Sequence, residues 1–538
     1  MKVQFLGAAQ TVTGSCFMIE TDKVRFAIDC GMHQGSNQVE KRNWDISPYD
    51  PARIDFIVIT HAHIDHSGLL PRMAGHGFSG PVYATEPTGD LLEILLLDSA
   101  HIQETEAAGR NKRMQRAGMK ADAVSLYTKK DAEALLPMIQ SRPYGEIFSP
   151  AQGIRIRFLD AGHILGAAII ELFIEENGTT TKLVFSGDIG RPNQLLMKDP
   201  TPLMDADFLF MESTYGNRNH KGESESIDEL AEAIAYSYRN GEKVVIPAFA
   251  VERTQEILYS LHLLSKDGRL PADMPVYLDS PLAIKATEIF RRHKAYLDAE
   301  TQALLKKGED PLKLPQLRFT SSTEESIRIN ERQEPAIVIS ASGMANAGRI
   351  LHHLRHNLWR PGASVVFVGF QAQGTNGRKI VDGAAKIRIF NEDIAIGAKV
   401  FTINGFSAHA GQTQLLDWLG TFQNAKMQVF LVHGENSAQE TLAELIRNKF
   451  GFTVTIPEYL EEIQLKLDGR IEEFRPRHIA ATPVDASHML DDLQNKINDL
   501  ISKRQLISAL PPSEQEEITQ WLQEATLTIE EIQMKAKG

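Results

Sequence analysis

Short apolar runs, separated by polar turns, dominate the first 210 residues of the chain. Runs of this kind, rich in Val, Ile and Phe, are typical of β-strands. Strands are therefore predicted at residues 2–6, 16–20, 25–29, 56–60, 154–159, 169–174, 182–186 and 208–211. Among them, residues 87–106 carry apolar positions at helical spacing and are predicted to form a helix. Hairpins mixed with helices predict sheets covered by helices rather than one parallel sheet.

Beyond about residue 223 the pattern changes to longer units in which helices and strands alternate. Helices are predicted at 226–239, 253–264 and 348–358, and strands at 243–247, 276–278, 336–340 and 364–368. This alternation favours a parallel sheet flanked by helices. From about residue 395 the strand-rich pattern returns, with strands predicted at 399–403 and 427–433 around a helix at 412–419.

The tail from about residue 475 has a helical pattern throughout. One helical stripe is formed by Leu490, Leu493, Ile497, Leu500 and Ile501. Pro511 and Pro512 end this stripe, and Ser513 with Glu516 three positions later has the signature of a capping box that starts a second helix. We expect a helical hairpin over residues 475–538 that packs on the body or on a second subunit, without a catalytic role.

The composition is that of an ordinary globular protein, with 42% hydrophobic and 24% charged residues. A length of 538 residues indicates about three domains. The two cysteines, Cys16 and Cys30, are too few for a disulfide framework. The N-terminus lacks the pattern of a signal peptide, and no apolar run is long enough to cross a membrane. We therefore expect a cytoplasmic protein without a membrane partner.

The formal net charge of −13 argues mildly against a nucleic-acid partner, because phosphates favour basic surfaces. Local patches can reverse that preference. Residues 110–116 form one such patch, with Arg110, Lys112, Arg113 and Arg116 in seven positions. Sequence alone leaves two interpretations open, a binding surface or a solvated helix face.

The segment after the strand at 56–60 concentrates metal-binding side chains. His61, His63, Asp65 and His66 lie within six residues at the end of this strand, and imidazole and carboxylate groups suit zinc. Structural zinc sites are closed by four ligands and often use cysteine, whereas the two cysteines here are not placed for that role. An open site with a catalytic water therefore fits this pattern better than a structural site.

Further candidates follow other predicted strands in the same way. His163, Asp188 and His433 each come at or just after the end of an apolar run, and each has a glycine beside it. Glycine lets the backbone approach a ligand closely. A single histidine at a strand end is more often structural than a ligand, but the pattern shared with residues 61–66 raises these three to candidate metal ligands.

Several of these segments resemble the motifs of a known family. Residues 61–66 match the HxHxDH motif of the metallo-β-lactamase superfamily, and Asp29, His163 and Asp188 fall where that superfamily has its other acid and ligands. Later segments resemble the β-CASP nuclease branch in its three additional motifs and in further blocks, namely Glu212, His409, His433, and residues 249–256, 279–283, 340–344 and 369–375. The resemblance runs from about residue 1 to 470 and does not cover the tail.

The resemblance implies an α/β fold, an αββα metallo-β-lactamase sandwich formed by residues 1–210 and 395–470. An inserted α/β β-CASP domain would span 211–394, and the C-terminal helical tail 475–538 would follow. The active site would lie between the first two domains. In this branch a histidine at the position of His433 marks enzymes that act on RNA, so the implied partner is single-stranded RNA. The branch often dimerises, so a homodimer is one expected state.

The resemblance also implies residue roles. His61, His63 and His163 would hold one zinc ion, Asp65, His66 and His433 a second, and Asp188 would bridge the two. Two Zn²⁺ are expected from the ligand types, with Mn²⁺ as an alternative. Asp29 would orient ligands from behind. These seven ligands and Asp29 are the expected metal centre.

The implied reaction is a two-metal in-line attack of a bridging hydroxide on an RNA phosphodiester. Asp65 would orient or deprotonate the water, His409 would protonate the departing 3′ oxygen, and Glu212 would hold the His409 imidazole. The products would carry a 5′-phosphate and a 3′-hydroxyl. The chain would thus be an endonuclease in RNA processing or decay that could also have 5′-exonuclease activity.

Substrate binding is expected from the inserted domain. The small polar turn with Ser340, Ser342 and Gly343 could cradle a phosphate through backbone N–H groups, and Arg349 and Arg378 could add charge-assisted bonds. Phosphate contacts position a strand without determining its sequence. The competing hypotheses are a hydrolase of small esters or thioesters, a DNA nuclease, and an inactive scaffold in an RNA-processing complex.

Overall fold

The computed structural model describes residues 1–466 apart from Phe370, Ala372 and Gln373, the backbone of residues 471–476, and scattered residues between 494 and 529. The chain divides into two compact units, Met1–Pro476 and Arg477–Gly538. The described residues of the second unit, such as Gln494, Ile497 and Leu500, are helical. The predicted positions Leu490, Leu493, Ser513 and Glu516 lie outside the described residues.

One layer of the first unit is an eight-stranded sheet in the order β23-β22-β1-β2-β3-β4-β5-β6. Its first strands form antiparallel hairpins, whereas β3 to β6 run parallel. The strand bounds are β1 Lys2–Phe5, β2 Phe17–Glu20, β3 Arg25–Ile28, β4 Phe56–Val58, β5 Val82–Ala84, β6 Ile139–Ser141, β22 Glu461–Leu465 and β23 Ile471–Pro476.

The second layer is a seven-stranded sheet in the order β21-β20-β11-β10-β9-β8-β7. Strands β7 to β10 form antiparallel hairpins, and β10, β11, β20 and β21 are parallel. The bounds are β7 Ile147–Ala151, β8 Ile154–Asp160, β9 Ala168–Glu176, β10 Thr179–Phe185, β11 Phe208–Glu212, β20 Gln428–Val432 and β21 Thr453–Thr455.

An aromatic core joins these two sheets. Phe17 on one sheet lies 5.6 Å from Phe185 on the other, between ring centroids, and Phe210 stacks on Phe185 at 4.3 Å and on Phe430 at 4.8 Å. Such pairs are each worth about 0.5–1.5 kcal/mol beyond the area they bury. These contacts hold the two sheets against one another.

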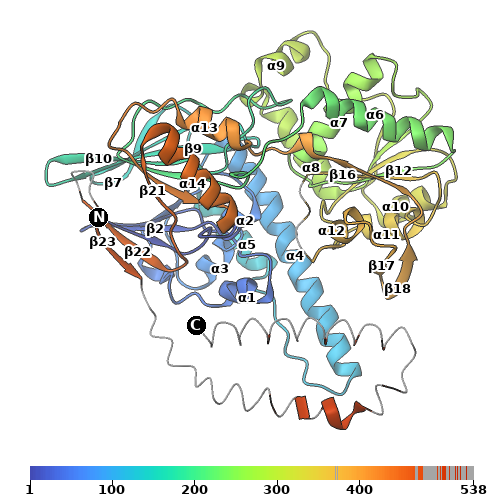
Figure 1. Cartoon of the computed structure of the whole chain (residues 1–538), viewed down its shortest axis with the longest axis horizontal. Helices are drawn as coiled ribbons and strands as arrows, with labels where there is room; N and C mark the ends of the chain where they lie inside the picture. Colours follow the sequence, from blue (N-terminus) through green and yellow to red (C-terminus); the bar gives the residue numbers. More distant parts are fainter. Residues whose placement is uncertain are drawn as a thin grey trace. The chain divides into compact units, whose positions relative to one another are not determined.

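Helices cover the outer faces of the sandwich (Figure 1). Helices α3, α4 and α5 pack together beside the eight-stranded sheet, and α14 packs on β20 and β21. Their bounds are α1 Asn37–Glu40, α2 Ile64–Ser67, α3 Leu70–Gly75, α4 Glu86–Arg116, α5 Lys129–Leu135, α13 Gln412–Leu419 and α14 Asn436–Phe450. Helix α4 runs ten residues beyond the predicted end at residue 106, because its second half is a polar helix without apolar spacing.

The inserted part is built on a six-stranded parallel sheet in the order β14-β13-β15-β12-β16-β19. The strands are β12 Val244–Pro247, β13 Val276–Leu278, β14 Leu317–Phe319, β15 Ile337–Ser340, β16 Ser364–Val368 and β19 Lys399–Ile403. The helices are α6 Glu223–Arg239, α7 Arg253–Lys266, α8 Pro281–Arg292, α9 Ala299–Lys306, α10 Thr323–Glu331, α11 Ile350–Asn357 and α12 Asn376–Val381. A hairpin of β17 Lys386–Ile389 and β18 Glu392–Ala395 lies beside them.

Strand β19 differs from the sequence prediction. Residues from 395 onward were expected in the metallo-β-lactamase part, but β19 pairs in parallel with β16 from Ser364↔Lys399 to Val368↔Ile403. An apolar strand carries no mark of the sheet that it joins, so the pattern alone could not assign it. As a consequence, the chain returns toward the sandwich through the 3-10 helix η5, Asn404–Phe406, at the carboxyl edge of the parallel sheet. The other 3-10 helices are η1 Lys41–Trp44, η2 Pro51–Arg53, η3 Leu136–Met138 and η4 Lys294–Tyr296.

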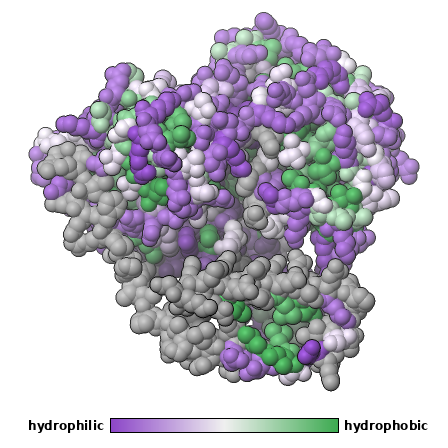
Figure 2. Space-filling model, viewed as in Figure 1, coloured by the Kyte–Doolittle hydropathy of each residue, from purple (hydrophilic) through white to green (hydrophobic). Residues whose placement is uncertain are grey.

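Among the residues coloured by hydropathy in Figure 2, hydrophilic ones cover most of the visible face. Across the residues that the structure describes, no helix has both the length and the apolar character needed to span a bilayer. Helix α4 has the length, but its sequence is polar over its second half.

Candidate metal centre

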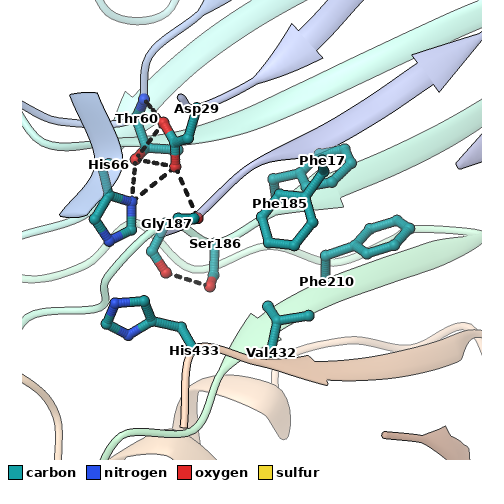
Figure 3. A pocket seen from close by; sticks show the side chains of 11 residues that line it. Phe17, Asp29, Thr60, His66, Phe185, Ser186, Gly187, Phe210, Val432 and His433 are labelled. Atoms are coloured by element: carbon teal, nitrogen blue, oxygen red, sulfur yellow. Dashed lines mark hydrogen bonds and ion pairs between the residues drawn. The ribbon is translucent and has the colours of Figure 1, made fainter. Parts of the chain in front are cut away.

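The predicted metal ligands meet at one edge of the sandwich. Strand β4 leads into the loop that carries His61 to His66, and the parallel strands β10 and β20 end just before Asp188 and His433. Because carboxyl ends of parallel strands lie at the same edge, side chains that follow them come together. Figure 3 shows His66 and His433 facing one another across this edge.

The first group of ligands is His61, His63, His163 and Asp188, whose ligand atoms all lie within 4.8 Å of one another. Asp188 Oδ2 lies 3.5 Å from Nε2 of His61 and 3.5 Å from Nε2 of His163. Nδ1 of His63 lies 3.1 Å from Nε2 of His61. Three imidazoles and a carboxylate thus surround one point.

The second group is Asp65, His66 and His433, again within 4.8 Å. Nε2 of His433 lies 3.5 Å from Asp65 Oδ2, and Nε2 of His66 lies 3.3 Å from Asp188 Oδ1. Asp188 therefore faces both groups, one with each oxygen. A carboxylate in this position could ligate a cation held by either group.

Asp29 supports the centre from behind. Its Oδ2 accepts from Nδ1 of His66 at 2.7 Å, and its Oδ1 accepts from the backbone N–H and the hydroxyl of Thr60. Ser15 donates a further bond at 3.3 Å. With Nδ1 of His66 engaged, Nε2 is the nitrogen directed into the site, which is the usual arrangement behind a metal-ligating histidine.

Close backbone packing fixes the ligand loop. Cβ on residue 31 would stand 1.7 Å from the carbonyl oxygen of Asp65, so only glycine fits beside this loop. Ser15 and Gly31 add backbone bonds, with the Ser15 N–H donating to the Asp65 carbonyl at 2.8 Å. The backbone of neighbouring segments thus fixes the position of this loop.

The protonation states of four of these side chains suit a cation. Burial lowers the pKa of His61 and of His163 well below the usual value, and it lowers the pKa of His63 to about 4. Burial opposes ionisation of Asp188, but the neighbouring His433 and His66 hold its pKa well below its usual range. Neutral imidazole and ionised carboxylate are the forms that bind metal.

Unpartnered buried atoms provide the test of fit. Among the described residues, Nε2 of His66, Nε2 of His433 and Oδ1 of Asp188 are buried without a hydrogen-bond partner. A buried polar atom without a partner costs about 1–3 kcal/mol, so such atoms are rarely left in one place. All three belong to the clustered side chains, with Nε2 of His66 close to Asp188 and Nε2 of His433 close to Asp65. The donor set therefore fits metal ions, as the sequence predicts.

His409 reaches the same edge from the inserted domain. Residues 407–409 follow η5, and His409 forms an isolated β-bridge with Gly190, two residues after Asp188. Nδ1 of His409 lies 3.2 Å from each carboxylate oxygen of Glu212 and 3.9 Å from Asp188 Oδ2. Burial disfavours the charged imidazolium, but the Glu212 and Asp188 carboxylates outweigh it and raise the pKa of His409 to about 9.

Glu212 is fixed in its turn. It is the last residue of β11, fully buried, and its Oε1 accepts the backbone N–H of Ile189 at 2.6 Å. The carboxylate thus binds the backbone next to Asp188 on one side and His409 on the other. This pair has the layout of an oriented acid–base histidine.

Three of the candidate phosphate-binding residues already have partners within the protein. Ser342 and Gly343 lie at the carboxyl edge of the parallel sheet, just after β15. Ser340 is buried, and its hydroxyl donates to the Asp279 carbonyl at 2.9 Å. Arg349 pairs with the Asp279 carboxylate at 2.7 Å. The Arg378 guanidinium pairs with Asp382 one turn away on α12.

The structure also identifies residues for which the sequence analysis had no role. Arg191, just after Asp188, donates to Glu256 on α7 at 3.0 Å, and Arg253 donates to the other oxygen of the same carboxylate. Glu252, with φ of +67°, is held there while burial and the nearby Glu256 raise its pKa well above the usual value. The block at 249–256 marked this region, but only the fold shows that it joins the inserted domain to the Asp188 loop.

A fold of two packed sheets covered by helices, with clustered histidines and aspartates at one edge, defines a metal-dependent hydrolase. Comparisons with known proteins agree. The metallo-β-lactamase superfamily matches residues 10–236, the Beta-Casp domain residues 254–380, and the Zn-dependent metallo-hydrolase RNA specificity domain residues 393–457. The chain belongs to the β-CASP branch of the metallo-β-lactamase-fold nucleases.

The similarity to individual proteins covers most of this chain. Ribonuclease TTHA0252 of Thermus thermophilus is 37% identical over 446 residues, which is 83% of this chain and 96% of that protein. Transcription termination factor FttA of Methanocaldococcus jannaschii is 30% identical over 475 residues, 87% of this chain and 72% of that protein. FttA of Thermococcus kodakarensis is 31% identical over 483 residues. The family, the α/β fold class and the class of metal-dependent ribonucleases expected from the sequence are thereby confirmed.

Proposed function

We propose that this chain is a zinc-dependent ribonuclease that hydrolyses RNA phosphodiester bonds with two metal ions. The convergence of seven residues with nitrogen and oxygen ligand atoms, some of them buried without a hydrogen-bond partner, carries this proposal. The match to an RNA specificity domain and the ribonuclease named among the relatives support RNA over DNA or a small ester as substrate.

Each of the two ligand groups would hold one metal ion. His61, His63 and His163 would hold one Zn²⁺, and Asp65, His66 and His433 the other, with Asp188 facing both. When bound, the two ions supply Lewis acidity at phosphorus and lower the pKa of the attacking water. Mn²⁺ is the alternative cation for the same oxygen and nitrogen donors.

The protein's own groups orient water and move protons. Asp65, with its carboxylate 3.5 Å from Nε2 of His433, would hold the attacking water in line with the scissile phosphorus. His409 would donate a proton to the departing 3′ oxygen, and Glu212 would keep the imidazole oriented and charged until then. The products would be a 5′-phosphate and a 3′-hydroxyl.

Substrate would lie along the carboxyl edge of the parallel sheet. His409 follows strand β19, and the turn with Ser342 and Gly343 follows strand β15 of the same sheet. Backbone N–H groups of that turn would cradle a phosphate. Arg349 and Arg378 would add positive charge beside this phosphate, and each is already paired with one acid.

The decisive experiment combines a labelled single-stranded RNA with a matched DNA and the purified full chain. Wild-type protein should cleave the RNA, chelation should abolish cleavage, and added Zn²⁺ should restore it. Asp65→Ala should keep the fold and lose activity. Equal RNA cleavage by wild type and Asp65→Ala, or protein that binds no metal, would overturn the proposal. Faster cleavage of the DNA would make it a DNA nuclease.

A separate measurement addresses whether the chain cuts RNA internally or from the 5′ end. We propose an endonuclease with 5′-exonuclease activity in addition. Product lengths from 5′-phosphorylated and 5′-hydroxyl RNA would distinguish the two, because internal cuts yield discrete long products and 5′-exonuclease action yields mononucleotides. Light scattering on the same preparation would test the expected homodimer.

A further inference from the structure

An arm made of residues 101–126 extends from the body, and none of its residues is fully buried. It comprises the second half of α4 and the segment that returns to Tyr127, and Figure 1 shows α4 running out beyond the sheets. Ala100 is the last buried residue of α4, and Tyr127 is the next buried residue along the chain. A surface helix normally buries one apolar face. Core packing therefore does not explain this arm.

The arm nevertheless has a defined shape. The Asn111 side chain pairs with both backbone groups of Ala123, at 2.8 and 2.9 Å, and fastens the returning segment to the helix. At the base, Gln103 accepts the Leu126 N–H at 3.1 Å, and the Tyr127 hydroxyl donates to Ser99 at 2.8 Å. These bonds hold the exposed helix and the irregular segment that returns from it together.

Its outer part is strongly cationic. Residues 107–120 contain Arg110, Lys112, Arg113, Arg116 and Lys120 and no Asp or Glu, in a chain with a net charge of −13. Arg110 meets Glu106 at 3.8 Å, where both side chains are more than half exposed, a pairing worth little in water. Across the described part of the chain, no acid lies within ion-pair distance of Lys112, Arg113 or Arg116.

The other end of α4 is attached to the metal centre. Thr85, which caps the helix, donates to the Gly166 carbonyl at 2.7 Å, and Thr88 in its first turn donates to the same oxygen at 2.9 Å. Gly166 lies three residues after His163. With 31 residues at about 1.5 Å each, the helix spans about 45 Å from the active-site loop to its tip.

We propose that this arm binds the sugar-phosphate backbone of the RNA outside the catalytic cleft. The identity of the ligand rests on the proposed ribonuclease function. Arg110 and Lys120 have only exposed acid partners, and the other three cations have none among the described residues. Cations of this kind on an ordered helix match a polyanion, and phosphate contacts add affinity without sequence preference. A strand long enough to reach the arm is held more tightly, whereas the bond-breaking step on a short strand does not involve it.

The test uses the full chain carrying Asp65→Ala, so that bound RNA stays intact. In the arm variant, Arg110, Lys112, Arg113 and Arg116 are changed to Gln, which keeps helix propensity. The control changes four exposed lysines elsewhere to Gln, namely Lys23, Lys306, Lys307 and Lys426. A third protein with Arg110, Arg113 and Arg116 changed to Lys retains the charge. Affinities are measured across salt concentrations for RNA of about eight and about forty nucleotides.

The arm variant should bind the long RNA roughly tenfold more weakly, and the slope of log affinity against log salt should fall by about 0.7 for each phosphate that the arm no longer neutralises. The arm variant should bind the short RNA as tightly as its parent does. The control and the lysine-retaining protein should bind both RNAs as tightly as the parent does. An unchanged affinity for long RNA, or an equal weakening in the control, would overturn the proposal. So would a changed oligomeric state with unchanged RNA binding, since exposed Met119 and Val124 would then mark a protein contact.

Failure of the proposed function gives a different result. If protein with an intact Asp65 cleaves no RNA while the Asp65→Ala protein binds long RNA through the arm, the nuclease proposal fails and the arm proposal stands. If RNA is cleaved normally but the arm variant binds long RNA as tightly as its parent, only the arm proposal fails.

Discussion

The Asp29 carboxylate accepts a hydrogen bond from Nδ1 of His66 at 2.7 Å, while Nε2 of the same ring lies 3.3 Å from Asp188. One buried acid thus selects the tautomer of a ligand whose other nitrogen faces the metal site. Burial disfavours charge on this ring, but Asp188 and Asp29 together raise the pKa of His66 well above its usual value. In the absence of a cation, a proton on Nε2 would take its place.

Asp29→Asn should therefore weaken metal binding by roughly 10–100-fold, the usual cost of removing a carboxylate behind a ligating histidine. The amide can present its NH₂ group to Nδ1 and so favour the wrong tautomer. Zinc affinity is measured by competition with a chelator. Asp207→Asn is the control, because Asp207 also caps a backbone N–H, that of Lys182, away from the site. Unchanged zinc affinity would show that His66 does not depend on Asp29.

The sequence predicted which side chains come together at one edge better than which sheet each strand joins. Ligands that follow strands within a few residues, such as His61 to His66, could be found because a local pattern carries both the strand and the metal chemistry. Strand β19 could not be assigned, because its partner β16 lies about 35 residues away and both strands are simply apolar. Arg349 looked free in the sequence, and only the fold brings the Asp279 carboxylate to it.

The Glu212–His409 pair should act as one unit. Glu212→Gln and His409→Ala should each lower the rate of RNA cleavage by roughly 10²–10⁴-fold, the usual value of general acid catalysis. The double variant should be scarcely worse than either single one, because both changes remove the same oriented proton donor. Rates under single-turnover conditions provide the measurement.

Zinc content distinguishes this role from metal ligation. One carboxylate oxygen of Glu212 lies within 4.8 Å of a ligand atom of Asp188 and of His433. These three residues are therefore a third group that could hold a cation. If Glu212 only positions His409, Glu212→Gln keeps the zinc stoichiometry of the wild type. Loss of zinc in this variant would assign Glu212 to the metal centre instead.

Glu256 should be a main contributor to the link between the inserted domain and the Asp188 loop. It is buried and accepts from both Arg191 and Arg253. Glu256→Gln leaves two buried guanidinium groups without an anion and should destabilise the fold by about 3–5 kcal/mol. Urea unfolding measures the loss. Glu309→Gln breaks the exposed pair with Lys266 and should leave the unfolding midpoint unchanged. Equal midpoints for the two variants would contradict this assignment.

His33 should make stability fall in mild acid. The ring is buried against the glycine backbones at residues 7 and 14, and burial together with Arg42 lowers its pKa from 6.5 to about 4. The folded state therefore binds this proton less readily than the unfolded chain. Its contribution to the free energy of unfolding is fully present above pH 6.5 and is lost as the pH falls toward 4.

The expected loss over this pH range is about 3 kcal/mol, since each unit of pKa difference corresponds to about 1.4 kcal/mol. His33→Phe keeps a ring in the same space but has no titrating group. Chelator-treated protein is used so that proton competition with metal does not contribute. The free energy of unfolding of the variant should fall less steeply between pH 6.5 and 4, whereas exposed His101→Gln should follow the wild type. Parallel curves for His33→Phe and wild type would show that His33 takes up its proton without opposing the fold.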